Sequence, residues 1–321
     1  MITRLKSYKD FGFHRLTLFT ASSPAFRWYS VKLPDMNIAT LPLLFCRLSQ
    51  TETLAYRPYG TGPTKVVLVH GLAARSETWS DLVSLFPANR YSIHLLDLLG
   101  SGESSKPKEG DYSIHGHAAR LIGFLKQEGL GQVVLAGHSL GGAVVLLTAI
   151  EVMLRDEHDL LASMIIMAGP GYIQRLPLMA DIFKNRYAAA LFVALYAPDV
   201  WVKVGLKMAY YDHSLIDGEH IARYAPCYRN KAAKRALVAT CRSLVPVNQE
   251  EITSRYQELR LPVLLLWGSH DQIVPLSQGT RLQAAIPGAK LRVIEECGHN
   301  PQEEKPLETY EVIDSFITNA N

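Results

Sequence analysis

Three features are scarce in this chain, and each scarcity argues against a class of protein. Its 321 residues contain only four cysteines, with no C-x-x-C pair, which argues against a disulfide scaffold or a zinc site. Apolar runs such as LPLLF and AAALFVALYA are far shorter than the ~20 residues of a bilayer-spanning helix. The net charge is +3 without a basic block, which argues against dedicated nucleic-acid binding.

Targeting signals and repeats are also missing from the sequence. The first residues, MITRLKSYKDFGFHRLTLFT, lack an apolar core followed by a small-residue cleavage site, so we expect no signal peptide. We therefore expect a cytoplasmic protein, and leave open a peripheral contact of this segment with a membrane. Hydrophobic residues make up 48% of the chain and charged residues 20%, a composition that suits a folded protein with a large core.

Short apolar runs alternate with helical patterns along most of the chain. The stretches 43–49 and 51–60 read as a strand hairpin. The alternation after them predicts an α/β fold, with a mostly parallel sheet covered by helices on both faces. The predicted strands are 65–71, 91–100, 132–138, 162–169, 261–269 and 289–298, and the predicted helices are 113–131, 139–147, 277–286 and 307–320.

The alternation breaks once, between residues 171 and 256. This stretch is rich in aromatic residues and mostly helical in pattern, with no convincing strand. We therefore predict a core formed by residues 41–170 and 257–321, interrupted by a helical cap at 171–256. Residues 1–40 are irregular in pattern and are interpreted as an N-terminal extension.

Three polar side chains follow predicted strands, in the order Ser, Asp, His. Ser139, Asp271 and His299 each come at or just beyond the carboxyl end of a strand. In open parallel sheets these ends lie along one edge, where ligands bind. We therefore expect the three side chains to meet there.

The serine lies in a special turn. The motif G-x-S-x-G, with Gly137 and Gly141 around Ser139, stands between a strand and a helix. Such a nucleophile elbow strains the backbone of the serine and leaves room only for small neighbours. It also directs the first amides of the following helix at the reacting centre, where they favour negative charge.

The chain resembles the α/β-hydrolase superfamily over nearly all of residues 40–320. The resemblance rests on VHG, DLLGSGES, GHSLGG, WGSHDQIVP and GHNPQEEKP, in that order and each in a matching strand context. It implies an α/β-hydrolase fold with a helical cap inserted between core strands. It also implies that Ser139 is the nucleophile, that His299 is the general base, and that Asp271 orients this base.

Other histidines and one other aspartate compete for these roles. We interpret His70 and His138 as structural, and His115 and His117, at the start of a helix, as solvated or capping. His270 is a further rival. Only His299 follows the last strand, where the superfamily places its base. Some relatives carry the acid after the strand before the insertion, but here that strand ends in MAGPGY without a carboxylate, which favours Asp271. Asp97 is the weaker rival and is interpreted as holding the loop DLLGSG.

The resemblance also places an oxyanion hole. Its two donors are the main-chain amides of Leu140, directly after the nucleophile, and Leu72, directly after His70 and Gly71. Such amides stabilise charge that appears only in the tetrahedral intermediate. No cluster has metal-ligand spacing, and LLGSGESS lacks a phosphate-loop motif, so we expect neither metal nor cofactor.

The composition of the predicted cap indicates the kind of substrate. Most of its large side chains are expected to pack within the cap, and a minority to line an apolar pocket over Ser139. Its basic residues are interpreted as a solvated face. The large side chains are Tyr172, Met179, Phe183, Tyr187, Phe192, Tyr196, Trp201, Met208, Tyr210 and Tyr211, and the basic ones are Arg175, Lys184, Arg186, Lys203 and Lys207.

The sequence thus predicts a serine hydrolase that cleaves apolar carboxylic esters. The first alternative is a carbon–carbon bond hydrolase of a ring-cleavage pathway, which uses the same triad. Many of those relatives carry Trp after the catalytic His and a Gly-rich stretch after HG, whereas this chain has Asn300 and LAARS. Lactone or thioester hydrolysis and a non-catalytic ligand receptor are further alternatives. The natural substrate and the oligomeric state are not readable from the sequence.

Overall fold

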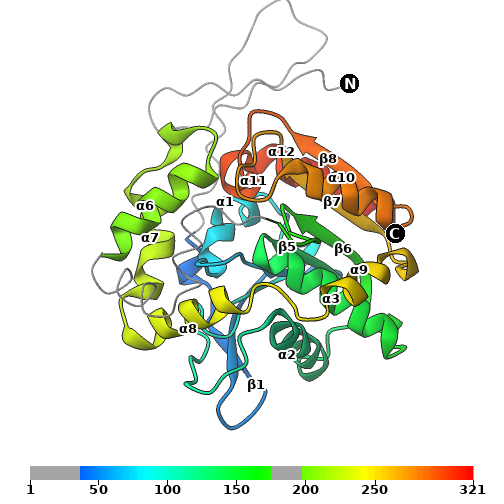
Figure 1. Ribbon diagram of the computed structural model, residues 1–321, viewed down its shortest axis with the longest axis horizontal. Coiled ribbons are helices and arrows are strands. Elements are labelled where there is room, and N and C mark those ends of the chain that lie inside the picture. Colours follow the sequence, from blue (N-terminus) through cyan, green and yellow to red (C-terminus); the bar gives the residue numbers. More distant parts are fainter. Residues whose placement is uncertain (1–36, 175–196, 321) are drawn as a thin grey trace, which may run out of the picture.

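A computed structural model describes residues 37–174 and 197–320 of the chain. Its centre is one eight-stranded sheet, with the strand order β1-β2-β4-β3-β5-β6-β7-β8 (Figure 1). The strands are β1 (Leu44–Arg47), β2 (Thr53–Tyr59), β3 (Thr64–Val69), β4 (Tyr91–Leu96), β5 (Val133–His138), β6 (Leu161–Met167), β7 (Val263–Gly268) and β8 (Lys290–Ile294).

The sheet is parallel from β4 to β8 and antiparallel at one edge. β1 pairs with β2, and β2 with β4, in antiparallel register, so the predicted hairpin is confirmed. The remaining pairs are all parallel. The carboxyl ends of β3, β5, β6, β7 and β8 therefore lie along one edge of the sheet, and the loops that follow these strands are brought together there.

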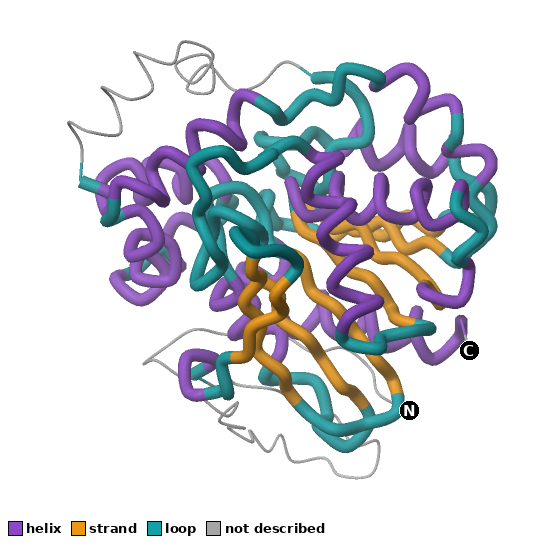
Figure 2. The backbone as a smooth tube through the Cα atoms, turned by 90° about the horizontal axis from the view of Figure 1, so that it is seen from below, coloured by secondary structure: helices purple, strands orange, loops and turns teal. Residues whose placement is uncertain are grey.

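Helices cover both faces of the sheet, as Figure 2 shows for the layer of strands between them. Val67 and Val69 of β3 pack in one core cluster with α2 (Ile114–Gln127), α3 (Leu140–Leu154) and α10 (Leu276–Ala285). Their neighbours Val66 and Leu68 pack in a second cluster, with α1 (Ser80–Val83) and α12 (Pro306–Ala320). This alternation follows from the period of two in a strand.

The sequence reading missed one helical stretch on the second face. A 3-10 turn, η2 (Ser76–Trp79), runs directly into α1, and Trp79, Leu82 and Val83 are fully buried against the sheet. The stretch is only two short turns long, so its apolar residues do not repeat often enough to give a helical period.

The stretch between β6 and β7 is helical over its described part, as predicted. Within residues 197–256 no strand occurs. The helices are α6 (Pro198–Ala209), α7 (Gly218–Tyr224), α8 (Lys231–Arg242) and α9 (Gln249–Ser254), and we call them the cap helices; α6, α7 and α8 gather on the left of Figure 1. The 3-10 turn η4 (His213–Leu215) lies between α6 and α7, η5 (Ala225–Tyr228) lies between α7 and α8, and η6 (Tyr256–Glu258) follows α9.

The last residues of the predicted N-terminal extension belong to the core. The 3-10 turn η1 (Ile38–Thr40) buries Ile38 completely among residues of the second core cluster. The guanidinium of Arg57 donates to the carbonyl of Leu41 at 2.9 Å and fixes the chain as it enters β1. Residues 1–36 lie outside the described part, so the extension is otherwise untested.

The described helices are of the length found in ordinary globular domains. The longest, α3 and α12, have 15 residues each, and α3 buries 12 of its residues. Among all helices of the described ranges, none is both long and apolar enough to cross a membrane. The remaining short elements are η3 (His158–Leu160) and α11 (Pro301–Glu304).

Candidate active site

Ser139 occupies the turn between β5 and α3. Its backbone has φ 53° and ψ −118°, a conformation that is unusual and costly for a residue with a side chain. Its N–H donates to the carbonyl of Met167 at 2.9 Å, which ties the turn to the end of β6. A strained serine at this junction is the geometry that a nucleophile elbow requires.

Two glycines let the turn form. A methyl group on Gly137 would lie 2.2 Å from the carbonyl oxygen of Gly141. A methyl group on Gly141 would lie equally close, 2.2 Å, to the carbonyl oxygen of Val69 at the end of β3. Both contacts are with main chain, which cannot move aside without displacing a strand or a helix. Helix α3 can therefore approach the sheet this closely only because both positions are glycine.

His299 and Asp271 meet at the carboxyl ends of β8 and β7. His299 Nδ1 lies 2.8 Å from Asp271 Oδ2, and both side chains are almost completely buried. The second oxygen, Asp271 Oδ1, accepts the N–H groups of Ile273 and Val274 at 2.8 and 2.9 Å. An acceptor carboxylate at Nδ1 holds the imidazole proton there, so Nε2 is left free to accept a proton.

His299 is next to the elbow. The rings of His299 and His138, the residue before Ser139, lie 4.8 Å apart. His138 Nε2 donates to the main-chain carbonyl of His299 at 2.9 Å. These contacts bring together the loops that carry the three residues predicted as nucleophile, base and orienting acid. Their catalytic roles remain a prediction.

The two amides predicted as oxyanion donors, those of Leu72 and Leu140, form no hydrogen bond within the described part of the chain. Leu140 is the first residue of α3, where the N–H groups of a helix have no partner within the helix. Both residues line the same cavity as Ser139. They are thus available to an oxygen atom bound at the serine.

His70 and Asp97 hold the loop after β3, which carries the amide of Leu72, and the loop after β4. His70 Nε2 accepts the N–H of Leu98 at 3.0 Å, so the proton is on Nδ1, which donates to the carbonyl of Gly71 at 2.8 Å. Asp97 accepts the N–H groups of Ser76 and Glu103 at 2.7 and 2.8 Å. Asp97 therefore braces its own loop and the one after β3, in agreement with the role predicted from the sequence.

The remaining rivals for the role of base, His115, His270 and His117, have other surroundings. His115 contacts Asn248 Oδ1 at 2.7 Å, and exposed His270 stacks on Tyr211 with ring centroids 4.4 Å apart. For His117 the expectation of a solvated or capping side chain was wrong. It is 2% exposed, and neither ring nitrogen has a partner among the described residues, because it lies on the face of α2 that packs toward the core.

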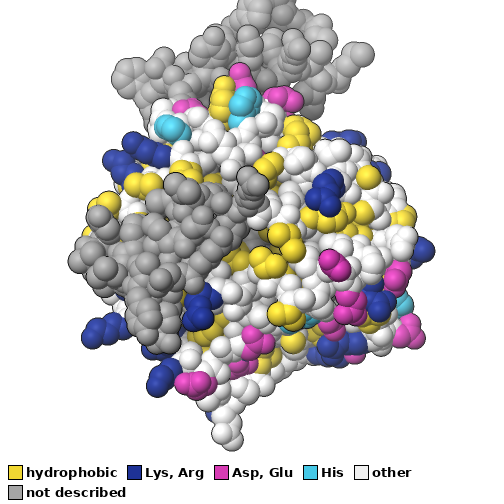
Figure 3. Space-filling view, in the orientation of Figure 1, with side chains coloured by type: hydrophobic (Ala, Val, Ile, Leu, Met, Phe, Trp, Pro, Cys, Tyr) yellow, Lys and Arg dark blue, Asp and Glu magenta, His cyan; other side chains and the backbone are white. Residues whose placement is uncertain are grey.

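An apolar cavity opens beside Ser139. It encloses about 920 Å³, counting the part that is open to solvent. Ala143, Leu146 and Leu147 of α3 form one wall, and Leu244, Pro246 and Ile252 of the cap segment form another. Ile173 and Val245 also line it and are 63% and 51% exposed, so they stand at its mouth. Apolar side chains gather near the middle of the face drawn in Figure 3.

The predicted cap aromatics contribute little to this cavity. Four of these aromatic residues lie in the described part of the chain, and of the four, Tyr172 lines the cavity. Trp201 and Tyr210 pack with α6 and α7 in a separate small core, and Tyr211 is half exposed. The cavity wall is instead mostly aliphatic. Met179, Phe183, Tyr187, Phe192 and Tyr196, and the basic residues Arg175, Lys184 and Arg186, lie outside the described residues.

The sequence reading also missed two buried carboxylates near the base. Glu303 and Glu304 follow His299 on α11 and are 4% and 7% exposed. Burial raises the pKa of both carboxyl groups. The motif GHNPQEEKP shows the pair, but nothing in it indicates that their partners are in the cap. Across the described ranges no group of three His, Cys, Asp or Glu side chains is placed to hold a metal ion.

The comparison with protein families agrees with this fold. A family model described as "alpha/beta hydrolase fold" matches residues 64–306. The chain belongs to the alpha/beta hydrolase family. Its membership supports a hydrolase activity in general, and leaves the bond that it cleaves to be inferred from the site.

Relatives of this family member differ in the chemistry that their names state. An uncharacterized hydrolase of Bacillus subtilis is 28% identical over 80% of this chain and 90% of its own length. A 2-hydroxy-6-oxo-6-phenylhexa-2,4-dienoate hydrolase of Burkholderia cepacia is 29% identical over 74% and 82%. A solved esterase of Thermogutta terrifontis has a TM-score of 0.72 at 23% identity, over 87% of this chain and 99% of its own, which shows the shared fold.

We predict that Asp271→Asn leaves the hydrolase folded and nearly inactive. The amide oxygen can still accept the N–H groups of Ile273 and Val274, but the amide nitrogen would donate to His299 Nδ1 and stabilise the wrong tautomer. The expected loss in kcat is about 10⁴-fold at neutral pH, with an unchanged Tm. The measurement is turnover of a short p-nitrophenyl ester beside a thermal melt.

Asp97→Asn is the matched comparison for this experiment. It replaces an acceptor of two amides by a group with one acceptor and a donor, so it should lower Tm more than kcat. If instead Asp271→Asn turned over normally while Asp97→Asn lost kcat at an unchanged Tm, the orienting acid would be Asp97.

We also predict that acid destabilises the protein through its buried histidines. Burial lowers the pKa of His70 and His138, and lowers that of His117 from 6.5 to about 3. Below pH 6.5 the unfolded chain therefore binds more protons, and the free energy of unfolding falls as pH falls. Each such histidine contributes about 1.4 kcal/mol per pH unit to this slope.

Urea unfolding between pH 6 and 4 measures this slope. His117→Leu should reduce the pH slope of the free energy of unfolding by the contribution of one histidine, because Leu has a similar volume and cannot bind a proton. Exposed His158→Gln is the control and should retain the wild-type slope. An unchanged slope for His117→Leu would contradict the assignment of His117 as buried and neutral.

Proposed function

We propose that this hydrolase cleaves carboxylic esters with apolar acyl groups through an acyl-enzyme. Ser139 Oγ attacks the ester carbonyl while His299 Nε2 takes its proton and then gives it to the leaving alcohol. The amides of Leu72 and Leu140 bind the oxyanion. Water, activated by His299, then releases the acid, and Asp271 keeps the imidazole in its working tautomer throughout.

The observation that carries this proposal is the apolar cavity beside Ser139. Most of the described residues that line the cavity have aliphatic side chains. Gln174 and Gln249 contribute the amide side chains of the lining. Such a surface favours an uncharged alkyl or acyl group, since each buried methylene contributes about 0.8 kcal/mol. It provides little to compensate the desolvation of a charged substrate.

Carbon–carbon bond hydrolysis is the second candidate. Relatives whose names state dienoate hydrolysis, such as the one of Burkholderia cepacia, favour it. Their named substrates are carboxylates, whereas the described cavity wall is apolar. A panel of p-nitrophenyl esters, a lactone, a thioester and a ring-cleavage dienoate distinguishes these reactions, and absence of turnover on all of them would favour a ligand receptor.

Ser139→Ala should fold normally and lose essentially all turnover. Loss of a triad serine costs on the order of 10⁶ in kcat in a comparable system. Exposed Ser315→Ala on α12 is the matched control and should behave as wild type. Ester cleavage by Ser139→Ala at a tenth of the wild-type rate would refute the mechanism.

The length of the cavity predicts a preference for medium acyl chains. Ala143 and Leu147 lie four and eight residues after Ser139, so the wall extends about 12 Å along α3. An extended acyl chain advances about 1.25 Å per carbon, so about eight to ten carbons would be covered. We expect kcat/KM to rise from acetate to octanoate esters, by up to about fourfold per methylene.

Ala143→Leu tests the direction in which the acyl chain lies. The larger side chain should fill the cavity one turn beyond Ser139 and reduce kcat/KM for octanoate while acetate is still cleaved at the wild-type rate. The acetate ester is thus the internal control. A flat or falling series from C2 to C8 in the wild type would reject an apolar acyl site.

A further inference from the structure

The loop that carries His299 is held from the side of the cap. The N–H of His299 donates to the carbonyl of Ala209, the last residue of cap helix α6, at 2.6 Å. From the core side, the carbonyl of His299 accepts from His138 at 2.9 Å. The main chain of the proposed base is therefore fixed between the elbow and the cap.

Glu304 joins the same two parts with one side chain. Its Oε1 accepts the N–H of Gly298 at 2.9 Å, one residue before the base. Its Oε2 accepts the N–H of Tyr211 at 2.7 Å, two residues after α6 ends. A single buried carboxylate thus bonds the base loop with one oxygen and the cap with the other.

The contact at Gly298 is too close to admit a side chain. A methyl group there would lie 2.2 Å from the carbonyl of Ala209 and 2.7 Å from the nitrogen of Tyr211. Main chain of the base loop therefore lies directly on main chain of the cap. A shift of residues 209–211 cannot be absorbed by side chains and must be transmitted to the loop.

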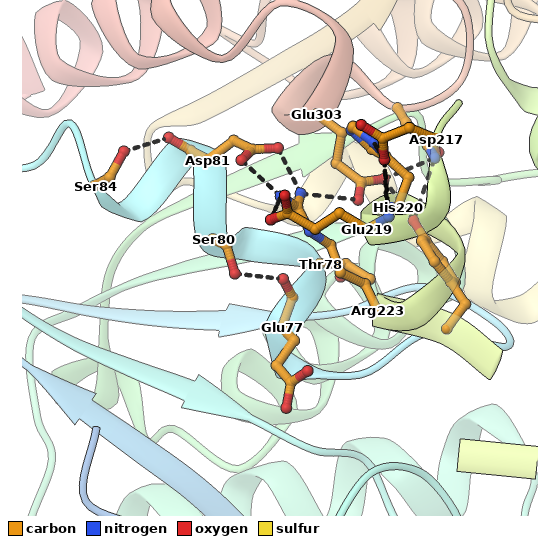
Figure 4. A network of polar contacts seen from close by, with 12 residues as sticks. Glu77, Thr78, Ser80, Asp81, Ser84, Asp217, Glu219, His220, Arg223 and Glu303 are labelled. Carbon is orange, nitrogen blue, oxygen red and sulfur yellow. Dashed lines mark hydrogen bonds and ion pairs between the residues drawn. The ribbon is translucent and has the colours of Figure 1, made fainter. Parts of the chain in front are cut away.

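A second group of buried charges anchors the cap itself. Arg223 of α7 forms two hydrogen bonds with Asp81 of α1, at 2.5 and 2.9 Å, and lies 3.7 Å from Glu303 of α11 (Figure 4). Glu303 also accepts from Tyr224 at 2.5 Å and from Asn300 at 3.0 Å. The cap, the core and the segment after His299 thus share one buried polar network.

We propose that Glu304 is a positioning residue, which sets the place of His299 by clamping its loop to residues 209–211 of the cap. This inference rests on the proposed function, in which His299 is the base. The carboxylate is suited to the task because both oxygens are acceptors and both partners are main-chain donors. No other side chain combines this length with two equivalent acceptor oxygens.

Two variants of Glu304 separate its span from its charge. In Glu304→Gln one carboxylate oxygen is replaced by an NH2 group, which would face a main-chain N–H, so one of the two hydrogen bonds to Gly298 and Tyr211 is lost. In Glu304→Asp the charge stays, but the side chain is one methylene too short to bridge Gly298 and Tyr211. Both should lower kcat by about 10-fold to 100-fold, because a base displaced by about 1 Å is no longer aligned with the reacting atoms.

The experiment measures kcat and KM for an ester together with the NMR signal of the His299 Nδ1 proton in its bond with Asp271. We expect KM to stay within about threefold, because the acyl cavity is untouched. The proton signal should shift or broaden in both variants. Glu308→Gln, an exposed glutamate four residues further along, is the control and should match the wild type in every readout.

The outcomes separate this inference from the proposed function. Wild-type kcat and an unchanged proton signal in Glu304→Gln would overturn the clamp. The clamp would also be overturned if activity fell only in proportion to a lower Tm while the signal of the His299 Nδ1 proton was unchanged. If Glu304→Gln does not fold, Glu304→Asp supports the same test. If Ser139→Ala retained activity the proposed function would fail, and the NMR comparison would still test the clamp.

Discussion

The structure depends on a main-chain contact between the start of α3 and the end of β3. Gly141 lies so close to the carbonyl of Val69 that any side chain would collide with it. This approach forces the turn at Ser139 into its strained conformation and points the free N–H groups of α3 at the cavity. The strain is stabilised by the packing of α3, which is buried along most of its length.

The chemistry of the site is spread over parts of the chain that are far apart in sequence. The elbow, the amides predicted to form the oxyanion hole and the carboxylate predicted to orient the base all lie at the carboxyl edge of one sheet. The loop of the base shares this edge and also contacts the cap through Ala209 and Tyr211. The position of His299 is therefore determined jointly by the sheet and the cap, whereas that of Ser139 is determined by the sheet and α3.

Much of this arrangement could be predicted from the sequence, for definite reasons. Buried strands such as β5 can be predicted because all their residues except a terminal one, here His138, are apolar or small. The elbow can be predicted because its glycines have a fixed spacing. Helix α3 is apolar on all sides, so its sequence did not reveal that Ala143 and Leu147 face the cavity. The burial of His117 was missed because its apolar surroundings come from other segments.

The polar network behind the base was beyond sequence reasoning. Arg223 and Asp81 are 142 residues apart, and each reads alone as a solvated charge on a short helix. Only the packing of α7 against α1 buries Arg223 and partly buries Asp81. In the same way, GHNPQEEKP shows two adjacent glutamates, but their acceptor roles depend on amides and hydroxyl groups of a segment that is inserted nearly 100 residues earlier.

The bond between His299 and Ala209 bears on how such enzymes can diversify. Caps inserted between core strands are natural places for change, because loops tolerate insertion better than sheets do. Here, however, the end of α6 is also part of the support of the base. A new cap could be grafted onto this core only if it brought a carbonyl and an amide to the same two points. The region from α8 to α9, which lines the cavity and lacks these bonds to the base loop, has more freedom to vary.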